Sequence, residues 1–159
     1  MLVEKSHGNI LGISVWHMED PAYTKKLFKA IAKNWPRIEK LKANFEHENL
    51  SDIKEIFLNC SQLNRLLLTL NVINLDDRLN CDELLEILTN FSPKTFYEFS
   101  FSEDCYFSVN GLQNFFENWR GRIPIKLNTR YFPTEEHEII VIKYIDEGVI
   151  DEKTRYLPW

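Results

Sequence analysis

The sequence predicts an α/β protein assembled from recurring units, each a strand next to a helix. The clearest unit covers residues 52–73, DIKEIFLNCSQLNRLLLTLNVI. Its first half places apolar residues along one helical face, namely Ile53, Ile56, Phe57 and Cys60. Its second half has the spacing Leu63-x-x-Leu66-x-Leu68-x-x-Asn71-x-Ile73, which is typical of a strand followed by an asparagine turn.

The same unit recurs on both sides of this stretch. Four expected helices end in asparagine and then an apolar residue, at Asn34-Trp35, Asn59-Cys60, Asn90-Phe91 and Asn118-Trp119. The residues at the centre of the expected strands are Ile13, Leu41, Leu66, Phe99 and Leu127, separated by 28, 25, 33 and 28 residues. These lengths are typical of leucine-rich repeats, with one loop insertion at residues 74–80.

We therefore predict a leucine-rich-repeat solenoid, with about five short parallel strands on a concave face and helices on a convex face. The strands are expected near residues 10–16, 38–44, 63–70, 96–102 and 124–130. A C-terminal capping helix over residues 134–147 begins at Thr134 and ends before Gly148. Residues 1–150 then form one domain and residues 151–159 a tail. An ordinary α/β domain with alternating elements is the alternative that the same pattern allows.

The composition limits the classes of partner and the cellular compartment that we expect. The net charge of the 159 residues is −5, without the basic stripe that nucleic-acid binding requires. No apolar run is long enough for a membrane span, and the N-terminal residues have no apolar core typical of a signal peptide. The three cysteines are widely spaced and lack a CxxC motif, so we expect no disulfide framework, a buried Cys60 and a reducing, intracellular setting in cytoplasm or nucleus.

No motif for catalysis is present, and we expect neither enzymatic activity nor a cofactor or metal. The four histidines are not at ligand spacing from one another, and no P-loop, GxGxxG or GxSxG motif occurs. The densest acidic group, Asp76, Asp77, Asp82 and Glu83, lacks the central glycine of an EF-hand loop. A small metal-dependent hydrolase using residues 76–83 is one alternative. A structural fragment that self-associates through an uncapped first strand is another.

Three segments in the C-terminal half carry a resemblance to a family. They are Phe91-Ser92-Pro93-Lys94-Thr95, then Leu112-x-x-Phe115-Phe116-Glu117-x-Trp119-Arg120, then Glu135-x-His137-Glu138-x-Ile140-Val141 onward through Lys143-Tyr144-Ile145-x-Glu147-Gly148-Val149-Ile150. Together with the helix–Asn–strand unit, they make residues 50–150 similar to F-box-like leucine-rich-repeat proteins of fungal, glomeromycete type. Those proteins recruit substrates to cullin-type ubiquitin ligases.

The resemblance implies a repeat fold and a protein-binding role. Its partner would be a ligase substrate or the ligase's adaptor subunit. The family's helical F-box segment, which docks that adaptor, is not visible in the sequence, because residues 1–20 predict a strand and a turn. The expected function is therefore a protein–protein interaction module, with substrate recognition as its role in the ligase.

The expected partner-binding surface is the concave strand face. Side chains alternate across a strand, so residues between the buried positions face away from the helices. The expected surface residues are Ser14, Trp16, Lys40, Lys42, Arg65, Leu67, Thr69, Glu98, Ser100, Lys126, Asn128 and Arg130. Trp16 could instead fold against the edge of the first strand. Tryptophan and arginine are common anchors in protein interfaces.

Overall fold

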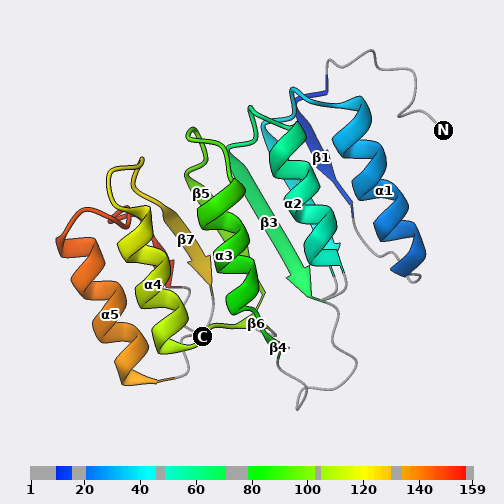
Figure 1. The fold of residues 1–159 in the computed structure, drawn as a ribbon. Helices are drawn as coiled ribbons and strands as arrows, with labels where there is room; N and C mark the ends of the chain where they lie inside the picture. Colours follow the sequence, from blue (N-terminus) through cyan, green and yellow to red (C-terminus); the bar gives the residue numbers. More distant parts are fainter. Residues whose placement is uncertain are drawn as a thin grey trace.

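A computed structural model describes residues 10–15, 21–45, 49–70, 79–102, 105–129 and 134–156. Its main feature is one six-stranded sheet in which every neighbouring pair is parallel. In spatial order the strands are β1 (Gly12–Ser14), β2 (Lys40–Phe45), β3 (Arg65–Leu70), β5 (Glu98–Phe101), β7 (Lys126–Thr129) and β8 (Arg155–Tyr156). The spatial order is the order in the sequence, which places successive units side by side (Figure 1).

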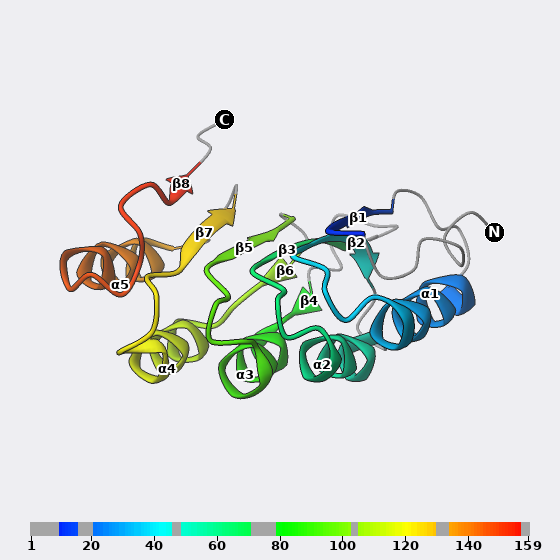
Figure 2. The same cartoon turned by 90° about the horizontal axis from the view of Figure 1, so that it is seen from above.

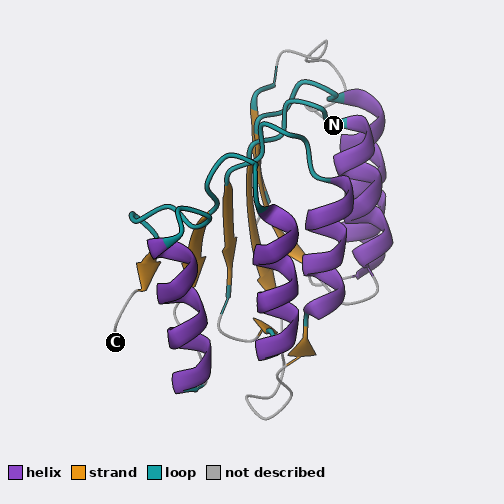
Figure 3. Ribbon diagram, turned by 60° about the vertical axis from the view of Figure 1, so that its left-hand side comes forward, coloured by secondary structure: helices purple, strands orange, loops and turns teal. Residues whose placement is uncertain are grey.

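Five described helices connect these strands. They are α1 (Pro21–Asn34), α2 (Leu50–Asn59), α3 (Asp82–Phe91), α4 (Val109–Trp119) and α5 (Glu135–Asp146). All five lie in a row along one face of the sheet (Figures 2 and 3). The α/β class, with parallel strands alternating with helices, is therefore confirmed. The opposite face of the sheet, which carries no helix among the described residues, is called here the helix-free face.

The pairing register aligns the residues that the sequence spacing identifies as equivalent. Ile13 pairs with Leu41, Leu41 with Leu66, Leu66 with Phe99, and Phe99 with Leu127. These residues are 28, 25, 33 and 28 positions apart in the sequence, yet the register places them in one row across the sheet.

Backbone hydrogen bonds before the strands repeat in the same way. One carbonyl accepts from two successive amides of the next unit, at equivalent positions in three units. The acceptors are Leu11 for Glu39 and Lys40 (2.8 and 3.1 Å), Glu39 for Asn64 and Arg65 (2.9 and 3.1 Å), and Asn64 for Tyr97 and Glu98 (3.0 and 3.1 Å). A recurring bond of this kind fixes each unit against the next, because neither unit can satisfy these groups alone.

The core lies between the sheet and the helix row and is rich in aromatic side chains. Phe96 packs edge-on against Phe57, with 5.5 Å between ring centroids, and against Trp119 at 6.3 Å. These rings come from three successive units and are at most 3% exposed. Burying a side chain of this size stabilises the fold by about 2 kcal/mol. The core is therefore continuous along the stack rather than enclosed within single units.

The asparagines near the helix ends form side-chain hydrogen bonds within their own helix. The side-chain amides of Asn34, Asn59 and Asn118 donate to the carbonyls of Ala30, Glu55 and Asn114, at 2.9, 2.8 and 2.8 Å. Each of these amides thus folds back onto its own last turn, where asparagine competes with continued helix. The next residue turns into the core, since Trp35, Cys60 and Trp119 are at most 2% exposed.

Several expectations about boundaries are corrected by the structure. Residues 155–156, expected in a tail, form β8, because Arg155 and Tyr156 pair in parallel with Asn128 and Thr129. The helix α5 is thus followed by a further strand. The turn residues Asn71 and Ile73 of the template stretch lie outside the described residues. The side chain of Thr134 contacts the Nδ1 atom of His137 at 2.7 Å rather than an amide of α5.

The cysteines also depart from expectation. Cys81 and Cys105, expected to be reduced, are joined by a disulfide with their Cα atoms 5.9 Å apart. Two short parallel strands, β4 (Leu79–Asn80) and β6 (Cys105–Tyr106), bring them together across 24 residues of sequence. Cys60 is fully buried as expected, and burial raises the pKa of its thiol to about 11.

Candidate functional site on the helix-free face

The helix-free face presents two rows of side chains that run across the strands. The register pairs Gly12, Lys40, Arg65, Glu98 and Lys126 in the first row, and Ser14, Lys42, Leu67, Ser100 and Asn128 in the second. Thr69 pairs with Asn44 beyond the second row. Ten of the expected surface residues are thus placed on neighbouring strands, while Trp16 and Arg130 lie outside the described residues.

Strand alternation explains why these side chains face away from the helices. Between them lie residues that point into the core: Leu41 and Ala43 on β2, Leu66 and Leu68 on β3, and Phe99 and Phe101 on β5. All six are at most 7% exposed. Burial of these six residues determines which side chains of each strand face away from the helices. A shift of the strand register by one residue would move every side chain to the other face.

Glu98 is the centre of a polar network that links three strands. Its carboxylate lies 3.3 Å from Nζ of Lys126 and 3.4 Å from Nε of Arg65, and it accepts a 3.0 Å hydrogen bond from the Nδ2 amide of Asn128. The same amide donates to the Ser100 hydroxyl at 2.9 Å. Each partly exposed ion pair contributes only about 0.2–1 kcal/mol. The network therefore fixes side-chain positions more than it stabilises the fold.

Arg65 is further held by Tyr97. Its Nε atom donates to the tyrosine hydroxyl at 2.5 Å, and its guanidinium lies 5.2 Å from the centroid of the ring. A guanidinium over an aromatic face gains a modest electrostatic attraction. Tyr97 was missed in the sequence, because it lies just before β5, where strand alternation does not apply. The Arg65 side chain is thus oriented by contacts within the chain.

A hollow of about 340 Å³ opens over the N-terminal half of the two rows. Its lining includes Gly12, Ser14, Lys40, Lys42, Arg65, Leu67, Glu98 and Ser100. Small residues create the space, since three of these positions carry glycine or serine. A Cβ atom on Gly12 would meet only the Cβ of Lys40, at 3.8 Å, so a larger side chain there would enter the hollow.

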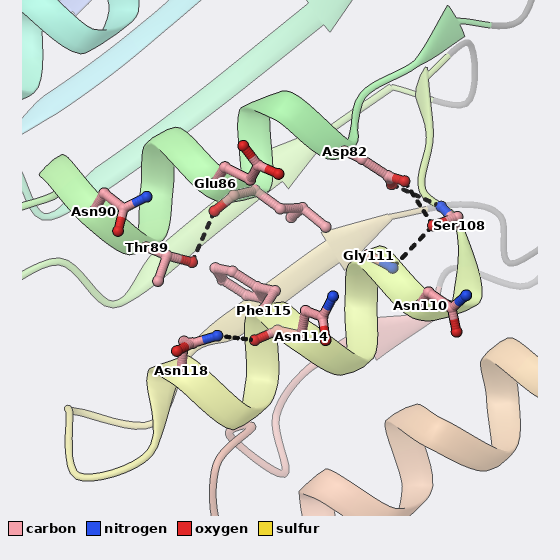
Figure 4. Close-up of a pocket in the computed structure, with 11 residues that line it drawn as sticks. Asp82, Glu86, Thr89, Asn90, Ser108, Asn110, Gly111, Asn114, Phe115 and Asn118 are labelled. Atoms are coloured by element: carbon pink, nitrogen blue, oxygen red, sulfur yellow. Dashed lines mark hydrogen bonds between the residues drawn. The ribbon is translucent and has the colours of Figure 1, made fainter.

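A second hollow, of about 400 Å³, lies between α3 and α4 on the helix side (Figure 4). Four asparagines line it together with Glu86 and Asp82. The Asp82 carboxylate accepts bonds from the Ser108 amide at 2.8 Å and the Ser108 hydroxyl at 2.6 Å, and that hydroxyl accepts from the Gly111 amide at 2.9 Å. Asp82 therefore holds the start of α4, where negative charge is favourable. A Cβ atom on Gly111 would overlap the carboxylate.

This arrangement bears on the acidic group at residues 76–83. Asp76 and Asp77 lie outside the described residues, and Asp82 is bonded to the cap of α4. Across the described ranges, no three histidine, cysteine, aspartate or glutamate side chains gather as metal ligands. The geometry that the structure provides for Asp82 is that of a helix cap.

Two further findings concern the class of protein. None of the helices in the described part of the chain is both long and apolar enough to cross a membrane. No family model, curated protein or solved structure matches the sequence.

Proposed function

We propose that this chain is a leucine-rich-repeat module that binds a protein partner through the helix-free face, without catalysis. The observation that carries the proposal is the pair of side-chain rows, held in place by the Glu98 network, with a hollow lined by β1, β2, β3 and β5. In a stack of strand-and-helix units the helix-free face is the concave binding surface. Side chains that are already ordered lose less conformational entropy when a partner binds.

The repeat assignment itself is supported by internal evidence. Equivalent strand residues share one row of the sheet, and equivalent carbonyls accept the same pair of hydrogen bonds in three units. These features favour a stack of similar units over an α/β sheet whose units differ. We infer that the helices form the convex side and that each unit corresponds to one leucine-rich repeat.

We further propose that the module is the substrate-recognition region of an F-box-like ubiquitin-ligase subunit, acting in cytoplasm or nucleus. Support comes from the three resembling segments, whose apolar members build the C-terminal units. Phe116 and Trp119 of α4 and Val141 and Tyr144 of α5 are at most 1% exposed. The resemblance thus concerns the framework, and the partner would be recognised by the residues of the helix-free face.

An affinity capture experiment tests the proposed surface. The full chain, immobilised, is compared with a Lys42→Glu/Leu67→Asp variant, and bound proteins are identified by mass spectrometry. We expect the variant to lose partners that the original chain captures, among which the ligase adaptor or ligase substrates should appear. A Lys25→Glu/Lys29→Glu variant is the matched control, because it carries two charge reversals on exposed residues of α1.

The outcome is interpretable only if the fold is retained. Leu67 is half-buried, so circular dichroism and a urea titration must first show an unchanged unfolding midpoint. If Leu67→Asp unfolds the chain, Lys42→Glu alone replaces the double variant. Equal capture by the folded variant and the original chain would remove the helix-free face as the site.

The intracellular setting has a separate test. Reducing compartments keep most protein disulfides reduced, so in such a compartment the Cys81–Cys105 bond of the structure should be open, and both cysteines should be alkylated when cells are lysed in iodoacetamide and denaturant. Recovery of the Cys81–Cys105 disulfide under those conditions would contradict a cytoplasmic or nuclear location.

A further inference from the structure

Two of the three cysteines form a site that the proposed function does not use. The side chains of Cys81 and Cys105 are buried, and their Cα atoms are 5.9 Å apart, within the range that a disulfide bridges. Cys81 directly precedes α3, and Cys105 begins β6, which leads into α4. The bond between them therefore joins the starts of two neighbouring helices.

We propose that Cys81 and Cys105 are a reversible redox site, oxidised by glutathione disulfide, whose reduction lets the junction between α3 and α4 open locally. The α3–α4 junction denotes here residues 79–82 and 105–112. The proposal goes beyond the proposed function, because it does not involve the helix-free face.

Hydrogen bonds within the junction hold the two cysteines together independently of their sulfur atoms. The Cys81 amide donates to the Tyr106 carbonyl at 2.9 Å, where β4 pairs with β6. The Asp82 carboxylate accepts from the amide and the hydroxyl of Ser108, at 2.8 and 2.6 Å. These bonds keep the reduced thiols next to each other, so the disulfide re-forms within one molecule at a high effective concentration.

The junction can open without disturbing the main sheet. The strands β4 and β6 have two residues each and form a sheet of their own, separate from the six-stranded sheet (Figure 1). Few bonds break when such a region opens, so local opening costs less free energy than global unfolding. The disulfide opposes this opening, because it closes a loop across 24 residues of sequence. Reduction removes that restraint and leaves the main sheet paired.

The oxidation is an exchange of one disulfide for another. The thiolate of one cysteine attacks glutathione disulfide, so that a mixed disulfide forms and one glutathione thiolate leaves. The second cysteine then attacks the protein sulfur of the mixed disulfide, and the second glutathione leaves. The chain loses two electrons and the two thiol protons, and two molecules of reduced glutathione receive them. An excess of reduced glutathione reverses both steps.

The third cysteine is a poor competitor in this exchange. Cys60 is fully buried in the core, and its sulfur lies 3.6 Å from the carbonyl oxygen of Trp35. Burial raises the pKa of its thiol to about 11, so little thiolate is present at neutral pH. The exchange therefore selects Cys81 and Cys105.

A titration of the full chain with glutathione tests the redox site. The chain is equilibrated in mixtures of reduced and oxidised glutathione, quenched with acid and alkylated, and each cysteine is followed by mass spectrometry. We expect mainly dithiol in a mixture as reducing as cytosol, and mainly the Cys81–Cys105 disulfide in one as oxidising as the lumen of the endoplasmic reticulum. A pair that stays oxidised in the first mixture, or reduced in the second, would overturn the proposal.

Hydrogen exchange of the two forms tests the local opening. Reduction should speed exchange at the amides of Cys81, Ser108 and Leu112, which all donate hydrogen bonds in the junction. The increase should be about tenfold larger there than at the amides of Asn64 and Tyr97, which bond carbonyls at the start of the main-sheet strands. Equal increases everywhere would show that the disulfide acts only on global unfolding, and would overturn the local device, as would no increase.

Two variants make the assignment specific. Cys81→Ser/Cys105→Ser should exchange like the reduced chain in every glutathione mixture. Cys60→Ala removes the remaining thiol and should leave the titration of Cys81 and Cys105 unchanged. A changed titration would show that Cys60 takes part and would contradict the assignment. If circular dichroism shows that the double variant is unfolded, the original chain kept reduced supplies the same comparison.

Discussion

Two carboxylates organise polar networks on opposite sides of the molecule. Glu98 lies on the helix-free face and contacts Arg65, Lys126 and Asn128 from neighbouring strands. On the helix side, Glu117 of α4 bonds Arg120 at 2.6 and 3.2 Å and accepts from the hydroxyl of Tyr144 in α5 at 2.5 Å. Both networks join consecutive units, but they differ in how far they are buried.

The helix-side network ends in the core. Tyr144 is fully buried, and Arg120 also contacts Glu147 after α5, so this network joins the last two helices. In the Glu98 network the side chains of Arg65 and Lys126 remain partly exposed at the surface. Polar groups on the helix side therefore hold two helices together, whereas those on the helix-free face join strands and stay partly exposed.

The largest effect is expected from a change at the α3–α4 junction on the helix side. Gly111→Val should destabilise the fold by about 3 kcal/mol, because the added side chain overlaps the Asp82 carboxylate and displaces the cap of α4. Urea unfolding measures the loss. Asn110→Ala, exposed one residue earlier on α4, should change stability by less than about 0.5 kcal/mol. Equal effects would mean that the junction tolerates rearrangement.

Removal of Asp82 itself should have a smaller effect. Asp82→Ala leaves the Ser108 amide and hydroxyl without their acceptor and should cost about 2 kcal/mol in the free energy of unfolding. Glu86→Ala, four residues further along α3, is the matched control and should be nearly neutral. Partner capture by the helix-free face should not change in either variant, since both residues lie on α3 at the helix side.

A change at Glu98 should affect binding more than stability. Glu98→Gln keeps the size of the side chain and removes the local negative charge, so stability should change by less than about 1 kcal/mol. Partner capture by the helix-free face should change by about threefold, because Arg65 and Lys126 lose the carboxylate that they contact. Quantitative mass spectrometry of the captured proteins measures the change. Unchanged capture would place Glu98 outside the binding surface.

Glu117 of the helix-side network should make the stability of the fold depend on pH. Hydrogen bonds from Arg120 and then Tyr144 lower the pKa of Glu117 to about 2, below its usual 4.5. The Glu117 carboxylate therefore takes up a proton at a higher pH in the unfolded chain than in the folded chain. The contribution of Glu117 is therefore complete above pH 4.5 and is lost as pH falls toward 2. Urea midpoints between these values should fall less steeply in Glu117→Gln. An unchanged slope would place the acid sensitivity elsewhere.

Much of the framework was predictable, because periodic burial leaves a direct trace in the residues. The spacing of Leu41, Leu66 and Phe99 predicted which residues share a row, and the register agrees. The asparagine near the end of four helices was visible as a recurrence, although the side-chain bonds of Asn34, Asn59 and Asn118 to the preceding turn were not. On the helix-free face, alternation placed Lys40, Lys42 and Leu67 correctly on the strands.

The errors have a common origin in contacts between distant residues. The number and spacing of the cysteines predict that Cys81 and Cys105 are reduced. The pairing of β4 with β6 instead brings them together as a disulfide. Residues 155–156 lack a leucine pattern and were assigned to a tail, but β7 offered an unpaired edge. The sequence places Asp82 in the acidic group at residues 76–83. In the structure its carboxylate accepts hydrogen bonds from the amide and the hydroxyl of Ser108.

The sequence by itself determined the α/β class, the repeating unit and the face of each strand, because these follow from local periodicity and the burial of apolar side chains. The tertiary structure decided where strands end, which acidic group caps a helix and which stands among cations, and where a hollow opens. Those properties depend on which side chains from different units meet. Glu98 and Asp82 are both carboxylates beside a strand or helix start, and only their neighbours distinguish a surface charge from a structural one.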